Sequence, residues 1–295
     1  MMSSSHKAGF VNIIGKPNVG KSTLMNALLG EKLSITTAKA QTTQRLITGI
    51  SNGPNFQIIY TDTPGVMTPK YALQQSMMQV VRKSLGDADV FLWVVDVHDN
   101  WHVPVDFRKK LLLQNTPIFL LINKVDLIGQ PALTQLMQYW ADHTAVTAII
   151  PVSALQAYNL SLVLEHVLAC LPQHPPYYPA DMLTDRSERF FAAEIIREKI
   201  LNNYHQEIPY SVSIIIETFK EETHLIKMRA VINTERKSQK NILIGNSGRA
   251  LKQVGIEARH DLEKFFKKKV FLEQHVKVVP GWRTQSHFLQ KLGYT

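Results

Sequence analysis

Eight residues near the start of the chain, Gly15 to Ser22, have the types and spacing needed to hold a phosphate chain. They read Gly-Lys-Pro-Asn-Val-Gly-Lys-Ser and fit the pattern Gly-x-x-x-x-Gly-Lys-Ser/Thr. In that pattern main-chain N–H groups surround an anion, the lysine (Lys21) reaches the β- and γ-phosphates, and the serine (Ser22) binds Mg²⁺. An apolar run precedes the motif and a helix-like segment, 24–29, follows it. This context favours a nucleoside triphosphate site over the alternative, a chance glycine-rich turn.

A second motif, Asn123-Lys124-Val125-Asp126, indicates which base is bound. A carboxylate at Asp126 accepts hydrogen bonds from the N1 and N2 hydrogens of guanine, whereas adenine would leave this acceptor unpaired, at a cost of about 2 kcal/mol or more. We expect Asn123 to tie the base-binding loop to the phosphate loop and Lys124 to lie along the base plane. Ser153-Ala154 follows a third apolar run and is expected to offer a backbone N–H to the guanine carbonyl.

The residues between these motifs predict a sensor of the third phosphate. Asp62-Thr63-Pro64-Gly65 follows a strand-like run, where Asp62 would hold Mg²⁺ through water and the Gly65 N–H would bind the γ-phosphate. Loss of that phosphate would release the following loop. The alternative is an ordinary turn, since these residue types favour turns. In the polar loop from Ser34 to Arg45 we expect a threonine ligand for Mg²⁺, and we favour Thr43 over Thr42.

Val66 stands where many GTPases place a glutamine that orients the attacking water. Because valine cannot form that hydrogen bond, we expect hydrolysis to be slow or to use another group. Asn18 is a candidate ligand for K⁺, a cation that would take the place of an arginine finger.

Composition indicates about two domains in 295 residues, of which 45% are hydrophobic and 19% charged. No apolar stretch reaches the ~18 residues of a membrane span, and the N-terminal segment is short and polar, unlike a signal peptide. Cys170 is the only cysteine, so we expect a reducing cytoplasm, and the 11 histidines show no metal-ligand spacing. Formal net charge is +9, and residues 227–295 hold 15 basic against 5 acidic side chains.

Residues 1–172 alternate strand-like and helix-like segments, which predicts an α/β domain with a mainly parallel sheet and helices on both faces. The expected strands are 10–14, 57–61, 90–96, 118–123 and 148–152, and 159–171 is expected to be the closing helix. All nucleotide motifs then fall at the carboxyl ends of strands. Four prolines between 171 and 179 predict a stiff linker over 173–184.

Residues 185–295 predict a smaller α+β domain with the element order α-β-β-α-α-β. A Gly-x-x-Gly loop, Gly245-Asn246-Ser247-Gly248, lies between two expected helices, as in KH domains that clamp single-stranded RNA. Arg249, Lys252 and Arg259 would meet phosphates, and Ile242, Ile244 and Val254 would form an apolar floor for bases. The alternatives are a helical turn with a basic surface, or a basic face that binds anionic lipid.

Taken together, these motifs resemble the Era family of bacterial GTPases, within the TrmE-Era-EngA-like superfamily. The resemblance covers essentially the whole chain, including Gln41-Thr42-Thr43 and Gly-x-x-Gly-x-x-Leu-Lys-x-Val-Gly. It implies a P-loop GTPase domain with a type II KH domain, GTP hydrolysis with Mg²⁺, and binding near the 3′ end of 16S rRNA during small ribosomal subunit assembly. It also implies loose association with the cytoplasmic face of the inner membrane. We expect a monomer.

The predicted site residues fall into four groups. Catalysis is expected from Lys21, Thr43 and Gly65, and metal ligation from Ser22, Thr43 and Asp62 for Mg²⁺ and Asn18 for K⁺. GTP or GDP would contact Gly15, Lys16, Pro17, Asn18, Val19, Gly20, Lys21, Ser22, Thr23, Asp62, Thr63, Pro64, Gly65, Val66, Asn123, Lys124, Val125, Asp126, Ser153 and Ala154. RNA would contact Gly245, Asn246, Ser247, Gly248, Arg249, Lys252 and Arg259.

Three sites depart from the family pattern: Ala40 replaces Pro, Gln44 replaces Arg, and Asn246-Ser247 replaces a pair that usually includes Lys. The first loop, residues 34–45, is therefore expected to be more mobile. In the clamp, one direct phosphate contact is expected to be lost, with Arg249 and Lys252 compensating. Two other functions remain open, a GTPase that assists tRNA modification and a membrane-peripheral switch. The first would need a second catalytic domain, for which no cofactor fingerprint is present.

Overall fold

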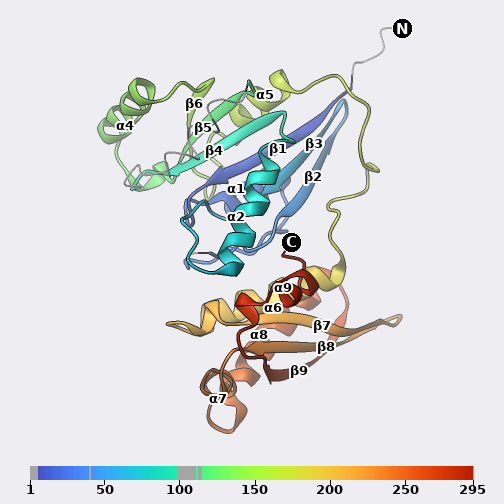
Figure 1. Cartoon of the computed structure of the whole chain (residues 1–295). Coiled ribbons are helices and arrows are strands. Elements are labelled where there is room, and N and C mark those ends of the chain that lie inside the picture. The colour runs from blue at the N-terminus through green and yellow to red at the C-terminus, as the bar shows by residue number, and fades with distance from the viewer. Residues whose placement is uncertain (1–5, 40, 99–110, 112–114, 295) are drawn as a thin grey trace. The chain divides into compact units, whose positions relative to one another are not determined.

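The computed structural model describes residues 6–39, 41–98, 111 and 115–294, so that Ala40 lies outside the described residues. The chain divides into two compact units, one of residues 1–70 and 74–185 and one of residues 71–73 and 186–295. Each unit is considered separately below (Figure 1).

The first unit is built on a six-stranded sheet with the strand order β2-β3-β1-β4-β5-β6. All neighbouring pairs are parallel except β2 and β3, which are antiparallel. The strands are β1 (Lys7–Gly15), β2 (Ile47–Gly53), β3 (Phe56–Asp62), β4 (Val90–Asp96), β5 (Ile118–Asn123) and β6 (Ala148–Val152). The predicted mainly parallel sheet is confirmed, and its central strands are fully buried runs of Val, Ile, Leu and aromatic residues.

Strand β2 was not among the five predicted strands. Its sequence, Ile-Thr-Gly-Ile-Ser-Asn-Gly, holds two glycines and an asparagine, which are depleted in strands. The strand forms because it lies at the sheet edge and pairs along its whole length with β3. Tertiary pairing therefore outweighs a weak local preference.

Helices follow the strands as the alternating pattern predicts. They are α1 (Lys21–Leu29), α2 (Ala72–Ser84), α4 (Gln130–His143) and α5 (Leu160–Cys170), with a short 3₁₀ helix, η1 (Val125–Leu127). Trp140 of α4 packs edge-on against Trp93 of β4, with ring centroids 5.5 Å apart. This contact lies in an apolar cluster that also includes residues of β5.

The proline-rich segment predicted as a linker is held on the first unit by hydrogen bonds to two strands, β3 and β2. Gln57 is fully buried, and its Oε1 accepts hydrogen bonds from the N–H groups of Tyr177 (2.7 Å) and Tyr178 (2.9 Å). Its Nε2 donates to the Tyr178 carbonyl at 2.8 Å. Farther along, the Ile50 N–H donates to the Leu183 carbonyl at 2.8 Å. Residues 177–183 thus lie along β3 and the edge strand β2.

The second unit has the elements α6 (Glu188–Asn203), β7 (Ser213–Glu221), β8 (Leu225–Thr234), α7 (Lys237–Ile244), α8 (Arg249–Phe266) and β9 (Lys269–Val278). This order, α-β-β-α-α-β, confirms the prediction. Strand β8 pairs antiparallel with β7 and parallel with β9. Short 3₁₀ helices η2 (Ile208–Tyr210), η3 (Asn246–Gly248) and η4 (Trp282–Thr284) and a final helix, α9 (Ser286–Lys291), complete it. The predicted order ends at β9, so the final helix was not predicted.

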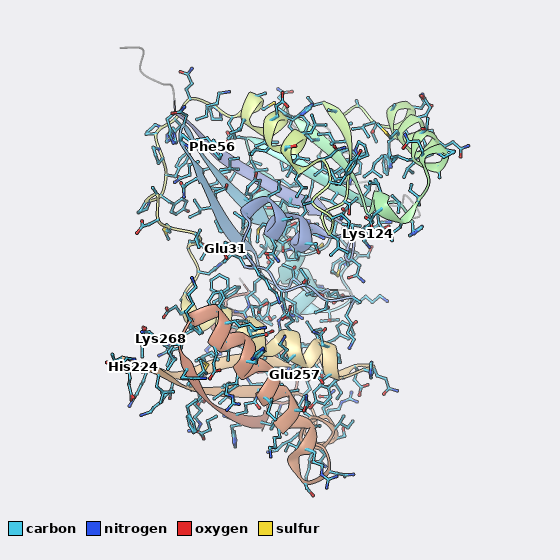
Figure 2. The ribbon with its side chains drawn as sticks, turned by 180° about the vertical axis from the view of Figure 1, so that it is seen from behind. Glu31, Phe56, Lys124, His224, Glu257 and Lys268 are labelled. Carbon is cyan, nitrogen blue, oxygen red and sulfur yellow. The ribbon has the colours of Figure 1, made fainter. Side chains whose placement is uncertain are left out.

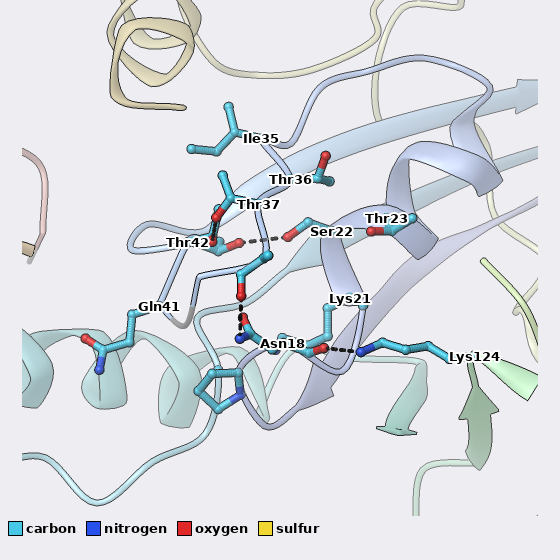
Figure 3. A pocket seen from close by; sticks show the side chains of 15 residues that line it. Asn18, Lys21, Ser22, Thr23, Ile35, Thr36, Thr37, Gln41, Thr42 and Lys124 are labelled. Carbon is cyan, nitrogen blue, oxygen red and sulfur yellow. Dashed lines mark hydrogen bonds between the residues drawn. The ribbon is translucent and has the colours of Figure 1, made fainter. Parts of the chain in front are cut away.

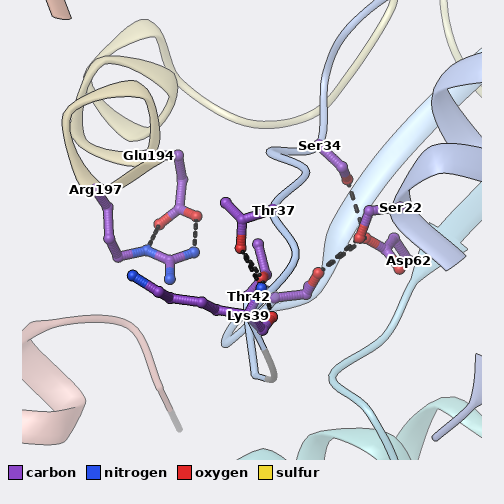
Figure 4. Close-up of polar contacts among 9 residues, drawn as sticks. Ser22, Ser34, Thr37, Lys39, Thr42, Asp62, Glu194 and Arg197 are labelled. Atoms are coloured by element: carbon purple, nitrogen blue, oxygen red, sulfur yellow. Dashed lines mark hydrogen bonds and ion pairs between the residues drawn. The ribbon is translucent and has the colours of Figure 1, made fainter. Parts of the chain in front are cut away.

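The helices and the sheet of this unit share one apolar core. Ile196 and Ile200 of α6, Val254 and Leu262 of α8 and alternate residues of β8 are all buried in it. Two charged residues of α6, Glu194 and Arg197, are also buried and form an ion pair (Figure 4). His224 lies at the tip of the β7–β8 hairpin, and Lys268, labelled near the same end of the sheet in Figure 2, pairs with Glu221 of β7. Among the residues that the structure describes, no helix has the length and apolarity to span a bilayer.

Candidate nucleotide site and RNA clamp

The phosphate loop runs from the end of β1 to the start of α1, as its sequence predicts. Gly20 precedes α1 with φ 96°, a left-handed conformation that disfavours residues with a side chain. A Cβ at Gly20 would also collide with the Asn123 side-chain nitrogen. That nitrogen donates to the Val19 carbonyl at 2.8 Å. The end of β5 and the phosphate loop are therefore packed in direct contact, and only glycine fits between them.

Lys21 points into this loop. Its Nζ donates to the carbonyls of Gly15 at 3.1 Å and Lys16 at 2.7 Å, and only 5% of the residue is exposed. Burial lowers the pKa of Lys21 to about 8, against an opposing effect of Asp62, which raises it. A buried ammonium whose hydrogen bonds to described residues go to neutral carbonyls is ready to pair with a phosphate.

Asp62 is the centre of a cluster of hydroxyl groups at the end of β3. Its Oδ2 accepts from Ser22 at 2.7 Å, from Ser34 at 3.0 Å and from Thr43 at 3.2 Å (Figure 4). Burial raises the pKa of Asp62, while Lys21 and the three hydroxyl groups lower it. The Oδ1 atom is buried without a hydrogen-bond partner among the described residues. A buried carboxylate oxygen with no donor suits a cation.

The two candidate threonines of the first loop lie in different networks. The Thr43 Oγ1 is 2.8 Å from the Ser22 Oγ, in the Asp62 cluster. The Thr42 Oγ1 instead donates to the Lys39 carbonyl at 2.7 Å and is 2.7 Å from the Thr37 Oγ1. Ser34 was not predicted as a site residue. Its type is common in solvated loops, so nothing in the sequence alone sets it apart.

The segment 62–66 lies directly against the phosphate loop. The Val66 N–H donates to the Gly15 carbonyl at 2.9 Å, and Gly65 packs on Pro17. Thr63 was predicted to contact the nucleotide, but it is fully buried and its hydroxyl donates to the Ile13 carbonyl at 2.8 Å. Thr63 therefore anchors this segment to β1, and its side chain does not reach the pocket.

The base-binding motif begins with Asn123, which bridges three segments. Besides its contact with Val19, its Oδ1 accepts from the Ala154 N–H at 2.9 Å. The Ser153 N–H donates to the Tyr158 carbonyl at 3.3 Å. The backbone N–H groups of Ser153 and Ala154 are thus both bonded to protein oxygens here, and a guanine carbonyl would have to compete with Asn123 for the Ala154 N–H.

The lysine and aspartate of the same motif point in other directions. Lys124 has φ 68° and pairs with Asp96 at the end of β4, and its Nζ also donates to the Asn18 carbonyl at 2.9 Å. Asp126 is exposed on η1, so its carboxylate is free to meet a base that arrives from solvent. Val125 packs against the apolar cluster beneath α4 and holds η1 in place.

A pocket of about 320 Å³ opens beside the phosphate loop (Figure 3). It is lined by Pro17, Asn18, Gly20, Lys21, Ser22, Thr23, Ile35, Thr36, Thr37, Ala38, Gln41, Thr42, Thr43, Gly65 and Lys124. The structure thus brings the phosphate loop, the first loop and Gly65 together around one space. Asp126, Ser153 and Ala154 do not line it.

The predicted RNA clamp lies between α7 and α8. Gly245 has φ 71°, and a Cβ there would be 2.7 Å from the Ala250 Cβ, so glycine is required. Ser247 also has a positive φ, 51°, and the Gly248 N–H closes the turn on the Gly245 carbonyl at 3.2 Å. A shallow groove beside the turn is lined by Asn241, Ile242, Ile244, Gly245 and Asn246.

The three predicted phosphate-binding residues of α8 are exposed and share one side of the helix. At 100° per residue, Arg249, Lys252 and Arg259 fall within about 80° of each other around the axis. Val254 was expected in the floor of the groove, but it is fully buried in the core of this unit. Of the three residues expected in the floor, Ile242 and Ile244 line the groove.

Two family models match the chain. One is described as a 50S ribosome-binding GTPase and matches residues 10–124, and the other is the KH domain model, which matches residues 207–283. The GTPase match ends at Lys124 and so includes the phosphate loop and Asp62. The KH match includes the clamp between α7 and α8.

Full-length relatives and solved structures carry the same combination. GTPase Era of Syntrophus aciditrophicus is 44% identical, over 98% of this chain and 95% of the relative. GTPase Era of Geotalea uraniireducens is 42% identical over the whole of both chains. A crystal structure of Era with MgGDPNP and nucleotides 1506–1542 of 16S ribosomal RNA matches with a TM-score of 0.93 and 38% identity, over 98% of this chain and 99% of that one.

A structure of a substituted Aquifex aeolicus Era bound to GDP·AlF₄⁻ matches with a TM-score of 0.91, also at 38% identity, over 98% of this chain and 99% of that one. With both family models matched and the relatives covered over nearly their whole length, this chain belongs to the Era family and is a GTPase with a P-loop GTPase domain and a C-terminal KH domain.

Proposed function

We propose that this GTPase binds single-stranded RNA near the 3′ end of 16S rRNA and acts in assembly of the small ribosomal subunit. The observation that carries the proposal is the exposed clamp of the KH domain, Gly245 to Gly248, beside a groove and a basic helix face. An Era relative has been crystallised with nucleotides 1506–1542 of this RNA.

The RNA would bind with its backbone at the clamp and its bases over the groove. A backbone that turns through Gly245 and Gly248 lets phosphates approach closely, and Arg249 and Lys252 lie directly after it. Because neither Arg249 nor Lys252 forms an ion pair with a described residue, both charges are available to phosphates. Asn246 and Ser247 bring hydroxyl and amide groups in place of a lysine.

The clamp is tested by replacing Asn246-Ser247 with Asp-Asp. Titration with a labelled 3′-end 16S oligonucleotide should show loss of binding, because two carboxylates would meet the phosphates. The affinity of the same variant for vesicles of anionic lipid should fall only in proportion to its two added negative charges. Equal RNA binding by the variant and the parent protein would contradict the proposal.

The Asp62 cluster fits Mg²⁺ because the atoms that converge there are hard oxygen donors. The Ser22 and Thr43 hydroxyls and the partnerless Asp62 Oδ1 are the ligand types that Mg²⁺ takes, together with water and phosphate oxygens. We therefore assign Mg²⁺ to Ser22, Thr43 and, through water, Asp62. When bound, the ion would supply charge that stabilises the phosphoryl transfer.

The residues of the pocket would hold GTP as follows. The N–H groups of the phosphate loop and the start of α1 would surround the β-phosphate, and Lys21 would exchange its carbonyl partners for phosphate oxygens. Gly65 would sense the γ-phosphate through its N–H, next to the Val66 amide that is already fixed on Gly15. Asp126 would select guanine from its exposed position on η1.

K⁺ is proposed to bind beside Asn18. The Asn18 Nδ2 donates to the Ala38 carbonyl at 3.1 Å, so an amide and a main-chain carbonyl from two loops meet at the edge of the phosphate pocket. A monovalent cation there would offset transition-state charge in the absence of an arginine finger. GTP hydrolysis rates measured in K⁺ and Na⁺ buffers of equal ionic strength test this assignment. Equal hydrolysis rates in the two buffers would contradict a K⁺ site beside Asn18.

We further propose that the protein is a cytoplasmic monomer that associates in part with the anionic surface of the inner membrane. The support is the net basic charge of residues 227–295, which attracts any anionic surface. Co-sedimentation with vesicles of increasing anionic-lipid content tests the association, and light scattering tests the monomer. Comparing the RNA affinity of the GMPPNP and GDP forms would test whether the nucleotide switches RNA binding.

A further inference from the structure

One residue of the first loop lines the nucleotide pocket but turns its side chain away from it. Gln41 is directed away from Asn18, Lys21 and Ser22 (Figure 3). Its backbone is left-handed, with φ 61°, which is uncommon for a residue other than glycine and persists only where surrounding contacts hold it.

The contact that holds it comes from α2. The Gln74 Nε2 donates to the Gln41 Oε1 at 3.2 Å, and Gln74 is only 5% exposed. The Gln74 Oε1 in turn accepts from the Lys70 N–H at 2.7 Å. One buried side chain thus bonds both to the loop that carries Thr43 and to the segment that follows Gly65.

The two hydrogen bonds of Gln74 reach the two parts of the chain that are expected to sense the third phosphate. Thr43 is two residues from Gln41 and reaches Ser22 and Asp62 in this structure. Gly65 lies against Pro17 of the phosphate loop, and the Met67 N–H, two residues on, lies 3.4 Å from the Met78 sulfur of α2. Residues 35–38 and 41–43 of the first loop line the pocket in this structure, in which Gln41 is bonded to Gln74.

We propose that the Gln41–Gln74 hydrogen bond is a latch that holds the first loop in the closed arrangement. Gln41 and Gln74 are positioning residues, because they act on GTP hydrolysis through Thr43 and do not touch the nucleotide. The inference rests on the proposed role of Thr43 as a Mg²⁺ ligand.

A latch made only in the closed arrangement has a specific thermodynamic signature. It strengthens the binding of a ligand that requires closure, a triphosphate, and leaves the binding of a diphosphate almost unchanged. Loss of a single net hydrogen bond corresponds to about a two- to tenfold change in the ratio of the two affinities.

Gln74→Glu removes the latch with little other change. Glutamate has the same shape and still accepts from the Lys70 N–H, but it has no Nε2 to donate to Gln41. Gln75→Glu is the matched control, because Gln75 is the neighbouring residue of α2, is exposed and gains the same charge. The measurements are the dissociation constants for GMPPNP and GDP with Mg²⁺, and the single-turnover rate of GTP hydrolysis.

We expect Gln74→Glu to weaken GMPPNP binding and slow hydrolysis by about two- to tenfold, with GDP binding unchanged and Gln75→Glu like the parent protein. The double variant Gln41→Lys/Gln74→Glu should restore the affinity ratio through an ion pair. The latch is overturned if Gln74→Glu weakens both nucleotides equally, as a purely structural defect would, or changes neither.

Two further variants keep the test decisive. If Gln74→Glu fails to fold, Gln41→Met removes the acceptor from the loop side and should give the same change in the affinity ratio. Thr43→Ala tests the metal site independently. If Thr43→Ala abolishes the preference for GMPPNP while the latch variants do nothing, the latch is wrong and the Mg²⁺ site stands. If Thr43→Ala has no effect, the proposed Mg²⁺ site itself fails.

Discussion

The Asn123 side-chain nitrogen donates to the Val19 carbonyl at 2.8 Å, so the strand that ends in the guanine motif is bonded to the loop that holds phosphate. Both atoms are buried, and the Asn123 Oδ1 is used by Ala154. Base recognition and phosphate binding therefore share one rigid joint.

Asn123→Asp should break this joint. The retained oxygen would keep the Ala154 contact. The oxygen that replaces the nitrogen would face the Val19 carbonyl, so an acceptor opposes an acceptor at a buried position. We expect a loss of about 1–3 kcal/mol in the free energy of unfolding and at least a tenfold weaker Kd for GDP. Fluorescent-GDP titration and thermal melts measure both. Asn202→Asp, at an exposed position of the KH domain, is the control, and a normal GDP affinity in Asn123→Asp would contradict the role of the joint.

Asp126→Asn should change the base preference. An amide in place of the carboxylate cannot accept both guanine hydrogens but can pair with the second carbonyl of xanthine. We expect GDP affinity to fall by two orders of magnitude or more, about 2.7 kcal/mol, and xanthosine diphosphate to bind better than GDP. Competition against a labelled nucleotide measures the order. Retained GDP preference would refute the role of Asp126.

Nucleotide affinity should depend on pH through Lys21, whose pKa in the free protein is about 8 because of burial. Bound phosphates stabilise the ammonium and raise this pKa, so binding takes up a proton above about pH 8. The Kd for GDP should be level below pH 7 and rise above pH 8, approaching tenfold per pH unit. Lys21→Arg stays charged and should flatten the profile. A flat profile in the parent protein would show that Lys21 is not the linked group.

Gln57→Leu should release the segment 177–183 from the GTPase domain. The change leaves the Tyr177 and Tyr178 N–H groups and the Tyr178 carbonyl without their partner. We expect the stability of the GTPase domain to fall by about 2–3 kcal/mol, the sum of several hydrogen bonds. Limited proteolysis should cut at this segment sooner. Gln138→Leu on the exposed face of α4 serves as the control, and unchanged proteolysis would contradict this account.

RNA affinity should fall steeply with salt, and part of the slope should come from α8. Neutralising Arg249 and Lys252 together as glutamines should reduce the slope of log K against log salt by about 1.4, since each phosphate contact on a single strand contributes about 0.7. Lys227→Gln is the control, because Lys227 is already paired with Glu222. If the double variant keeps the parent slope, Arg249 and Lys252 do not contact phosphates.

The sequence predicted most of the elements whose residues follow a strong local pattern. Buried apolar runs indicated five strands of the first sheet, and the glycine and charge pattern indicated the clamp. It missed β2, whose glycines and asparagine look like a loop, because pairing with β3 is a long-range effect. The contact of Ser34 with Asp62 and that of Gln57 with Tyr177 were missed for the same reason, since they join residues 28 and 120 positions apart.

The edge strand β2 has a consequence for fragments that contain only the GTPase domain. In the intact chain the Ile50 N–H and the Thr48 carbonyl at the open side of this strand are bonded to Leu183 and Thr184. A GTPase fragment that ends at Leu171 would leave those groups without hydrogen-bond partners. Unpaired edge strands form intermolecular sheets with other chains. Aggregation of this fragment would then result from loss of the segment that contains Leu183 and Thr184. A fragment that extends through Thr184 should not aggregate.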